Sequence, residues 1–227
     1  MAEPNGILRG EWRELIATLV RHGPRLALLF AALLLPMWLF LELADEVHEG
    51  ESLPFDEPIL LFAQAMARDG FDRVFLYFSA AGYQYGVVPF DILLVAGLAI
   101  ARRFRDSVFA GLSIGGSALL NIATKQLYAR DRPSLWESIA PESTFSFPSG
   151  HAMGSMTLAL VLLLLCWRTR WRWWVVAAMA VFVPMVGLSR VYLGVHYPSD
   201  ILAGWAAATV WVLGAWVLVR PLRARPA

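Results

Sequence analysis

The sequence predicts an all-α integral membrane protein, a six-transmembrane-helix bundle with an N-terminal helix at the membrane interface. Two observations support this fold class. Of the 227 residues, 58% are hydrophobic, which exceeds the roughly 45–50% of soluble domains, and the mean hydropathy is +0.56. Several apolar runs also approach the roughly 20 residues that a helix needs to cross a bilayer.

Six apolar runs, separated by charged or proline-containing segments, are the predicted membrane spans. They cover residues 26–44, 86–101, 108–123, 153–167, 173–188 and 201–219. We therefore expect one membrane domain, residues 26–220. It is preceded by a cytoplasmic segment, 1–25, that forms either an interfacial amphipathic helix or a solvated tail, and it is followed by a basic tail, 221–227.

The segments between the first two spans are polar. Residues 45–58 contain six acidic side chains and two prolines, so we expect a loop there. Residues 59–85 mix charged and aromatic side chains and are predicted to form a short interfacial helix. Asp91, within the second span, is expected either to face the bundle interior or to lie among the lipid headgroups.

The arginines predict the orientation in the membrane. A cytoplasmic N-terminus would place four groups of arginines inside, at positions 9–25, 102–105, 168–172 and 220–225. This distribution follows the positive-inside rule, so both termini are expected in the cytoplasm. The net charge of only +1 does not suggest nucleic-acid binding, and the single cysteine, Cys166, excludes a disulfide within the chain.

Three polar segments interrupt the apolar background, and the predicted topology brings all three to the outer face. Residues 125–133 read KQLYARDRP, residues 147–151 read FPSGH, and residues 189–200 read SRVYLGVHYPSD. Together they supply cations, two histidines, a carboxylate and a glycine-containing turn. These groups suit phosphoryl transfer, in which negative charge spreads over the phosphate oxygens.

Cations and a helix N-terminus are predicted to hold the phosphate. Arginine can contact two phosphate oxygens at once, lysine acts as a point charge, and backbone N–H groups at a helix start favour an anion. The predicted phosphate-binding residues are Lys125, Arg132, Ser149, Gly150 and Arg190. Arg130 fits this group or a role as an interfacial anchor. Asp131, Glu137 and Glu142 could tune selectivity, but we expect them to lie in a solvated loop.

Two histidines are predicted to carry the chemistry. His196 can attack phosphorus if a carboxylate holds its other ring nitrogen, and Asp200, four residues later, can fold back on it. His151 would then protonate the leaving oxygen, and water would hydrolyse the phosphohistidine. A metal site built from the histidines with Asp200 and Asp131 is disfavoured, because the neighbouring cations would repel the ion.

The three motifs in this order resemble those of the type 2 phosphatidic acid phosphatase superfamily, the lipid phosphate phosphatases. The match is complete at every motif position and covers residues 125–200: Lys125-x6-Arg132-Pro133, Pro148-Ser149-Gly150-His151 and Ser189-Arg190-x5-His196-x3-Asp200. The resemblance implies a six-helix core, a phosphohistidine on His196, acid catalysis by His151 and phosphate contacts from the residues named above. It also implies that neither a divalent metal nor another cofactor is required.

Within that superfamily, the apolar spans favour a bacterial inner-membrane lipid phosphatase over the soluble haloperoxidases. Expected substrates are undecaprenyl pyrophosphate, phosphatidylglycerol phosphate or phosphatidic acid. The first is preferred, because an outward-facing site would meet the carrier lipid that envelope polymer synthesis releases. Two other functions stay open. A lipid-headgroup phosphotransferase would need an acceptor for its phosphate, and a non-enzymatic lipid transporter would tolerate His196→Ala.

Overall fold

The computed structural model describes residues 23, 27–28, 30–50 and 53–219, and this part of the chain contains helices and no β-strand. The all-α prediction is therefore confirmed for it. A helix over residues 30–48 is followed by α2 (Asp56–Ala65), α3 (Asp69–Ala81), α4 (Val87–Ile100), α5 (Phe104–Tyr128), α6 (Gly150–Cys166), α7 (Arg172–Tyr192) and α8 (Pro198–Val219). The predicted interfacial helix within 1–25 and the tail 221–227 lie outside the described residues.

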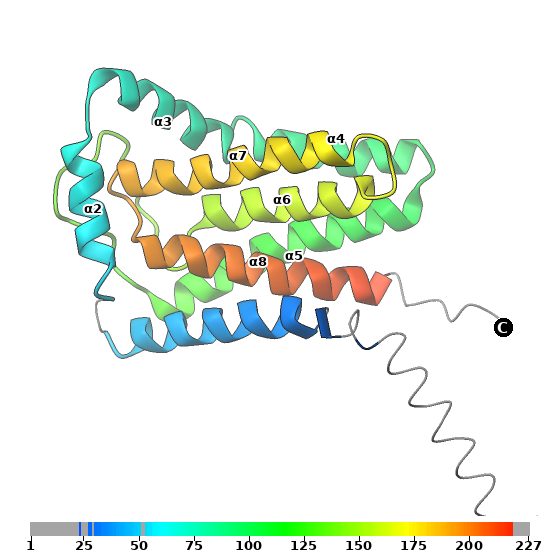
Figure 1. Ribbon diagram of the computed structural model, residues 1–227, viewed down its shortest axis with the longest axis horizontal. Helices are drawn as coiled ribbons and strands as arrows, with labels where there is room; N and C mark the ends of the chain where they lie inside the picture. Colours follow the sequence, from blue (N-terminus) through cyan, green and yellow to red (C-terminus); the bar gives the residue numbers. More distant parts are fainter. Residues whose placement is uncertain (1–22, 24–26, 29, 51–52, 220–227) are drawn as a thin grey trace, which may run out of the picture.

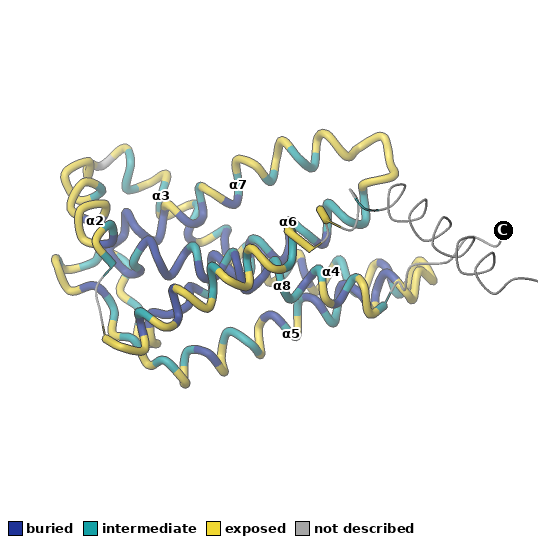
Figure 2. The backbone as a smooth tube through the Cα atoms, turned by 60° about the horizontal axis from the view of Figure 1, so that its bottom comes forward, coloured by how far each residue is buried: buried dark blue, intermediate teal, exposed yellow. Residues whose placement is uncertain are grey.

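The long helices lie side by side along one axis, as Figures 1 and 2 show. Helix α6 packs against α5, α7 and α8, so it runs through the middle of the bundle. The short helices α3 and α4 follow one another along one side, where α3 packs on α7 and α4 packs on α5. Helix α2 crosses the end of the bundle and contacts α7 and α8 there (Figure 1).

The lengths and surfaces of the helices fit a bilayer. Helices α5, α7 and α8 are long and apolar enough to cross a membrane, and α4 and α6 are shorter apolar helices. Large apolar side chains, such as Leu93, Leu119 and Trp174, are exposed on the outside of the bundle. A soluble monomer rarely exposes so much apolar surface. The chain is therefore an integral membrane protein.

The observed helices differ from the predicted spans mainly at their ends. Helix α5 continues to Tyr128 and α7 to Tyr192, so Lys125 and Arg190 lie in last helical turns. An apolar run ends at the first charged residue. The helix itself can continue past that residue, because its backbone hydrogen bonds do not depend on an apolar side chain.

The segment between the first two apolar runs is also more helical than predicted. Residues 45–48 extend the first helix into the expected loop, and residues 59–85 contribute to two helices, α2 and α3, and not to one. Pro58, expected to break a helix, lies in the first turn of α2, where its missing N–H removes no helical hydrogen bond.

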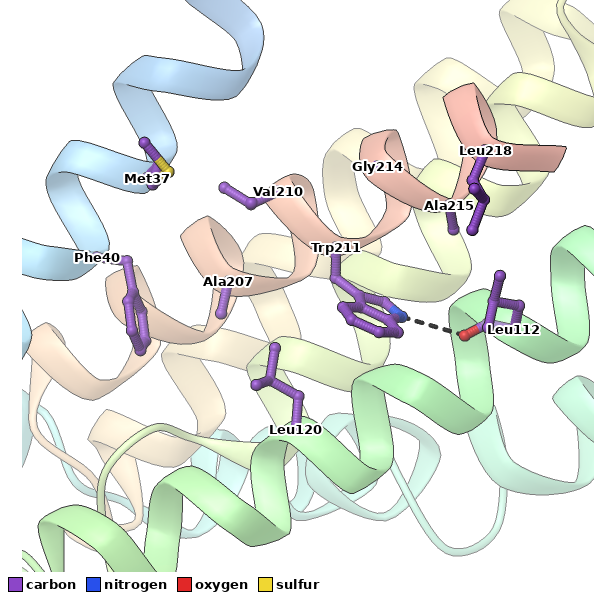
Figure 3. A pocket seen from close by; sticks show the side chains of 10 residues that line it. All are labelled: Met37, Phe40, Leu112, Leu120, Ala207, Val210, Trp211, Gly214, Ala215 and Leu218. Atoms are coloured by element: carbon purple, nitrogen blue, oxygen red, sulfur yellow. Dashed lines mark hydrogen bonds between the residues drawn. The ribbon is translucent and has the colours of Figure 1, made fainter. Parts of the chain in front are cut away.

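An apolar cavity lies between the 30–48 helix, α5 and α8 (Figure 3). Met37 and Phe40 line it from the first helix, and Trp211 of α8 donates its Nε1–H to the backbone oxygen of Leu112, at 3.1 Å. None of its lining residues belongs to the three polar segments. The cavity is therefore not a candidate for the catalytic centre.

Candidate active site

The three polar segments meet at the end of the bundle where α2 lies, on the left of Figure 1. The first segment begins in the last turn of α5, the second leads into α6, and the third links α7 to α8. The arginine-rich turns between α4 and α5 and between α6 and α7 lie at the opposite end. The topology thus places the three polar segments at one end of the bundle and the arginines of these two turns at the other.

Two close backbone approaches shape the turns that carry the histidines. Gly194 has φ +68°, and a Cβ added there would lie 2.6 Å from Cε2 of Trp136, so only glycine fits the turn before His196. At Gly204 of α8, an added Cβ would lie 2.9 Å from the backbone oxygen of Ser149. The absence of a side chain at Gly204 lets α8 approach the turn that begins α6.

The imidazole of His196 lies between a carboxylate and a guanidinium. Its Nδ1 is 3.3 Å from Oδ2 of Asp200, and its Nε2 is 3.2 Å from Nη1 of Arg132. A guanidinium can only donate, so Nε2 must accept and the ring proton is assigned to Nδ1, facing Asp200. The lone pair of Nε2 therefore points toward the cations, as a nucleophile's must.

The surroundings of His196 keep its ring neutral. Burial and the positive charges of Arg132, Arg190 and Lys125 lower the pKa of His196 well below its usual value, although Glu142 opposes this shift. A neutral imidazole has the free electron pair that attack on phosphorus requires. His196 is thus available as a nucleophile at neutral pH.

Asp200 is fully buried and held on both carboxylate oxygens. Its Oδ2 accepts hydrogen bonds from the hydroxyl of Ser146 and from the backbone N–H of Tyr197, at 2.9 Å for the latter. Its Oδ1 accepts one from Nη1 of Arg130 at 2.7 Å. Arg130 is therefore part of a buried ion pair and not a snorkelling anchor at the membrane surface.

The carboxylate of Glu142 lies among the predicted phosphate-binding cations. Its Oε2 accepts a hydrogen bond from Nη2 of Arg132 at 2.6 Å, and its Oε1 pairs with Arg190. Nδ1 of His151 is 3.8 Å from Oε1, and Nε2 of His196 is 4.0 Å from Oε2. Two imidazoles and two guanidinium groups thus surround one anion.

The expectation of a solvated Glu142 is therefore wrong. Burial favours its protonated form, but the charges of Arg190, Arg132 and Lys125 outweigh burial and lower the pKa of Glu142. The carboxylate thus stays ionised in the pocket. An acidic residue between two cationic motifs is the only signal that the sequence offered for this role.

The remaining predicted residues lie around the same pocket. Lys125 donates to the hydroxyl of Thr144 at 3.3 Å and to the backbone oxygen of Phe145, and Lys125, Glu142, Gly150 and His151 line a polar cavity. Ser149 is fully buried and caps α6, because its hydroxyl accepts the N–H of Ala152 at 3.4 Å. The structure does not place its side chain in the lining of this cavity.

The chemistry of the donors does not favour a metal. Within residues 53–219 and the other described positions, no three His, Cys, Asp or Glu side chains form a group that could hold a metal ion. The anion pocket instead contains Arg132 and Arg190, which are permanently charged. Such a set binds anions.

An apolar groove between α4, α5 and α6 leads into the polar cavity. The two hollows share Tyr83, Asn121, Ile122 and Gly150 in their walls. Asp91 lies in the wall of the groove and is 7% exposed. It therefore faces the bundle interior and does not lie among the lipid headgroups. The site therefore combines a charged pocket with an apolar approach.

Known proteins resemble this chain in sequence and fold. The model of the PAP2 superfamily matches residues 106–224. Phosphatidylglycerophosphatase B of Bacillus subtilis is 30% identical over 172 residues, 74% of this chain and 84% of that protein. An undecaprenyl-diphosphatase of Sulfolobus acidocaldarius is 32% identical over 147 residues, 63% of this chain and 65% of that protein. The crystal structure of the transmembrane PAP2 type phosphatidylglycerolphosphate phosphatase from Bacillus subtilis matches with a TM-score of 0.74 and 25% identity, over 85% of this chain and 98% of that one.

Proposed function

Because the chain belongs to the PAP2 superfamily and is a membrane lipid phosphatase, we propose that it hydrolyses the terminal phosphate of a lipid diphosphate or monophosphate at this pocket. The observation that carries the proposal is the position of the Glu142 carboxylate. Two arginines bind this oxyanion and two imidazoles face it. A substrate phosphate offers the same cations more oxygens and more charge, so it would take the place of Glu142.

The apolar groove supports a lipid as the substrate. Its walls, built from α4, α5 and α6, are mostly apolar and continue into the cavity that contains Lys125 and His151. A lipid tail in the groove would place its phosphate at the histidines. The headgroup would then lie at the end of the bundle and the tail within the membrane.

In the first chemical step, Nε2 of His196 attacks phosphorus, and the bond from phosphorus to the leaving oxygen breaks. His151 donates a proton to that oxygen, and the charge of the arriving phosphate favours the protonated ring of His151. Arg132, Arg190 and Lys125 stabilise the charge on the transferred group. The products of this step are the dephosphorylated lipid and a phosphohistidine.

In the second step, water attacks the same phosphorus, and the bond to His196 breaks. The now neutral His151 accepts a proton from the water, which regenerates its acid form. Inorganic phosphate leaves the pocket. Asp200, which holds Nδ1 of His196, stabilises the positive charge that the ring carries in the intermediate.

The proposed membrane arrangement has six crossings within one domain, residues 26–220. They are the 30–48 helix, α4, α5, α6, α7 and α8. The arginines of the turns opposite the site support cytoplasmic termini and a site at the periplasmic face of a bacterial inner membrane.

Undecaprenyl pyrophosphate is the first substrate we propose, because an outward-facing site meets carrier lipids at that surface. The name of the Sulfolobus acidocaldarius relative supports this choice. Phosphatidylglycerol phosphate is the second, because the Bacillus subtilis relative is a phosphatidylglycerophosphatase. Both lipids end in a phosphate that the pocket can enclose.

The decisive measurement is phosphate release from a panel of purified lipid phosphates in EDTA. We expect turnover by the natural sequence and by Cys166→Ser, a control remote from the site. We also expect loss of nearly all turnover in His196→Ala, a decrease of several orders of magnitude. Full activity of His196→Ala, or complete loss in EDTA that added metal restores, would overturn the proposal. Phosphate released only with a hydroxyl-bearing acceptor would indicate transfer in place of hydrolysis.

A further inference from the structure

We propose that Asp56 and Arg130 are positioning residues that hold the carboxylate of Asp200 in the orientation that His196 requires. Neither residue occupies a position in the three sequence motifs. The inference rests on the proposed phosphohistidine mechanism and adds to it a buried chain of charges behind the nucleophile.

The guanidinium of Arg130 joins two buried carboxylates. Nη1 donates to Oδ1 of Asp200 at 2.7 Å, and Nη2 donates to Oδ2 of Asp56 at 2.9 Å. Cζ of Arg130 lies over the ring of Tyr197, 3.9 Å from its centroid. Both terminal nitrogens thus serve carboxylates, and the stacked ring holds the group in place.

Asp56 connects helix α2 to the first turn of α8. Its Oδ1 accepts the backbone N–H of Ser199 at 2.9 Å, and its Oδ2 accepts the hydroxyl of Ser199 at 2.5 Å. Asp56 therefore caps the N-terminus of α8 from another helix, one residue before Asp200. This contact holds the first turn of α8, and with it the position of Asp200.

The orientation of Asp200 follows from how its two oxygens are divided. Arg130 occupies Oδ1, which leaves Oδ2 for Nδ1 of His196, with Ser146 and Tyr197 as further donors on the same oxygen. Without Arg130, Oδ1 would be a buried acceptor that has lost its donor, and the carboxylate would rotate or bind a proton. Either change would weaken the hold on His196.

A role in substrate binding is disfavoured by the same geometry. The phosphate pocket is built by Arg132 and Arg190 around Glu142, whereas Arg130 contacts the far oxygen of Asp200. We therefore expect Arg130 to act on the chemical step and not on affinity. This distinction makes the proposal testable by kinetics.

The first experiment compares Asp56→Asn, Arg130→Gln and Arg130→Lys with the natural sequence. The matched control is Arg103→Gln, which removes an Arg–Asp pair at the opposite end of the bundle. We expect kcat to fall about 10- to 100-fold in Asp56→Asn and Arg130→Gln, as for the outer partners of metal-bound histidines, with KM unchanged. Arg130→Lys keeps the positive charge, so its kcat should fall less than that of Arg130→Gln. The recovery should be partial, because one ammonium cannot bridge both carboxylates as a guanidinium does.

The second experiment combines each substitution with Asp200→Asn. If Asp56 and Arg130 act through Asp200, replacing them should cause no further loss of kcat in the Asp200→Asn background. If they have an independent structural role, the fold-losses of the two single variants should multiply in the double variant. Multiplied losses, or a raised KM with unchanged kcat, would overturn the inference. If Arg130→Gln does not fold, Asp56→Asn, which keeps its size and one acceptor oxygen, carries the same comparison. Activity retained by His196→Ala would instead overturn the proposed mechanism itself.

Discussion

At the scale of single residues, the pocket holds a carboxylate of the protein where we propose that the substrate phosphate binds. Glu142 engages Arg132 and Arg190, the same donors that a phosphate needs. A substrate phosphate that binds there would have to break these ion pairs. The contacts lower the intrinsic affinity for phosphate, and they keep the cations satisfied while the site is free of substrate.

Replacing Glu142 with glutamine should strengthen phosphate binding. We expect the KM of Glu142→Gln and its inhibition constant for inorganic phosphate to fall about three- to tenfold, the effect of roughly 1 kcal/mol of lost competition. Steady-state kinetics with increasing phosphate measure both constants. Glu137→Gln is the control, since Glu137 is exposed in the same loop. An unchanged or raised KM in Glu142→Gln would contradict the proposal that Glu142 competes with phosphate for the arginines.

The pH dependence should report the neutral state of His196. Protonation of the nucleophile abolishes attack, and burial with the nearby arginines lowers its pKa, so the acid limb of kcat/KM should lie below pH 6.5. Glu142 raises the pKa of His196, so Glu142→Gln should shift this limb to still lower pH. The pH dependence of kcat/KM, measured for the natural sequence and for Glu142→Gln, tests whether the acid limb of the variant lies at lower pH. An acid limb at or above pH 6.5, or a shift in the opposite direction, would contradict the assignment.

The sequence could predict the motif residues but not the residues behind them. Lys125, His151 and His196 occur in short patterns whose chemistry is readable from spacing. Asp56 contacts Ser199, 143 positions away, and no local pattern connects the two. Glu142 looked like an ordinary loop acid for the same reason, because its partners come from other segments.

At the scale of elements, the helices were predictable and their ends were not. Apolar runs located α4 to α8, but α7 continues through Ser189 to Tyr192 because the buried Arg190 finds partners in Ser79 and Glu142. The start of α2 was missed because its acidic residues indicated a loop, whereas Asp56 is buried against α8. Hydropathy therefore does not predict that a polar residue lies in a helix when tertiary contacts pair its side chain.

The turn between α7 and α8 depends on Gly194. Replacement by alanine would force a left-handed backbone on a residue with a Cβ and place that atom against Trp136. We expect Gly194→Ala to lower the free energy of unfolding by about 1–3 kcal/mol, the usual strain at such positions. Its activity should also fall, because His196 follows two residues later.

The control for this substitution is Gly97→Ala in α4, where an added Cβ meets nothing within 4 Å. Its melting temperature should stay unchanged or rise slightly, since alanine is the better helix former. Thermal unfolding in detergent, followed with activity, separates the two variants. Equal effects of both substitutions would show that the turn does not require glycine.

At the scale of the whole molecule, the bundle separates two kinds of charge. The end with α2 gathers the anion pocket, and the opposite end gathers the arginines of the α4–α5 and α6–α7 turns. Positively charged segments remain on the cytoplasmic side when a membrane protein inserts. The same distribution that orients the protein would therefore expose the catalytic pocket to the outer surface.

The single natural cysteine allows this orientation to be tested directly. In a Cys166→Ser background, Ile139→Cys places a thiol on the loop at the pocket end, where Ile139 is 61% exposed, and Thr169→Cys places one in the exposed α6–α7 turn. A membrane-impermeant maleimide should label position 139 in intact cells and position 169 only after the membrane is opened. Because these positions lie at opposite ends of the bundle, the reverse pattern would place the pocket in the cytoplasm. Carrier lipids at the outer surface could then not be its substrates.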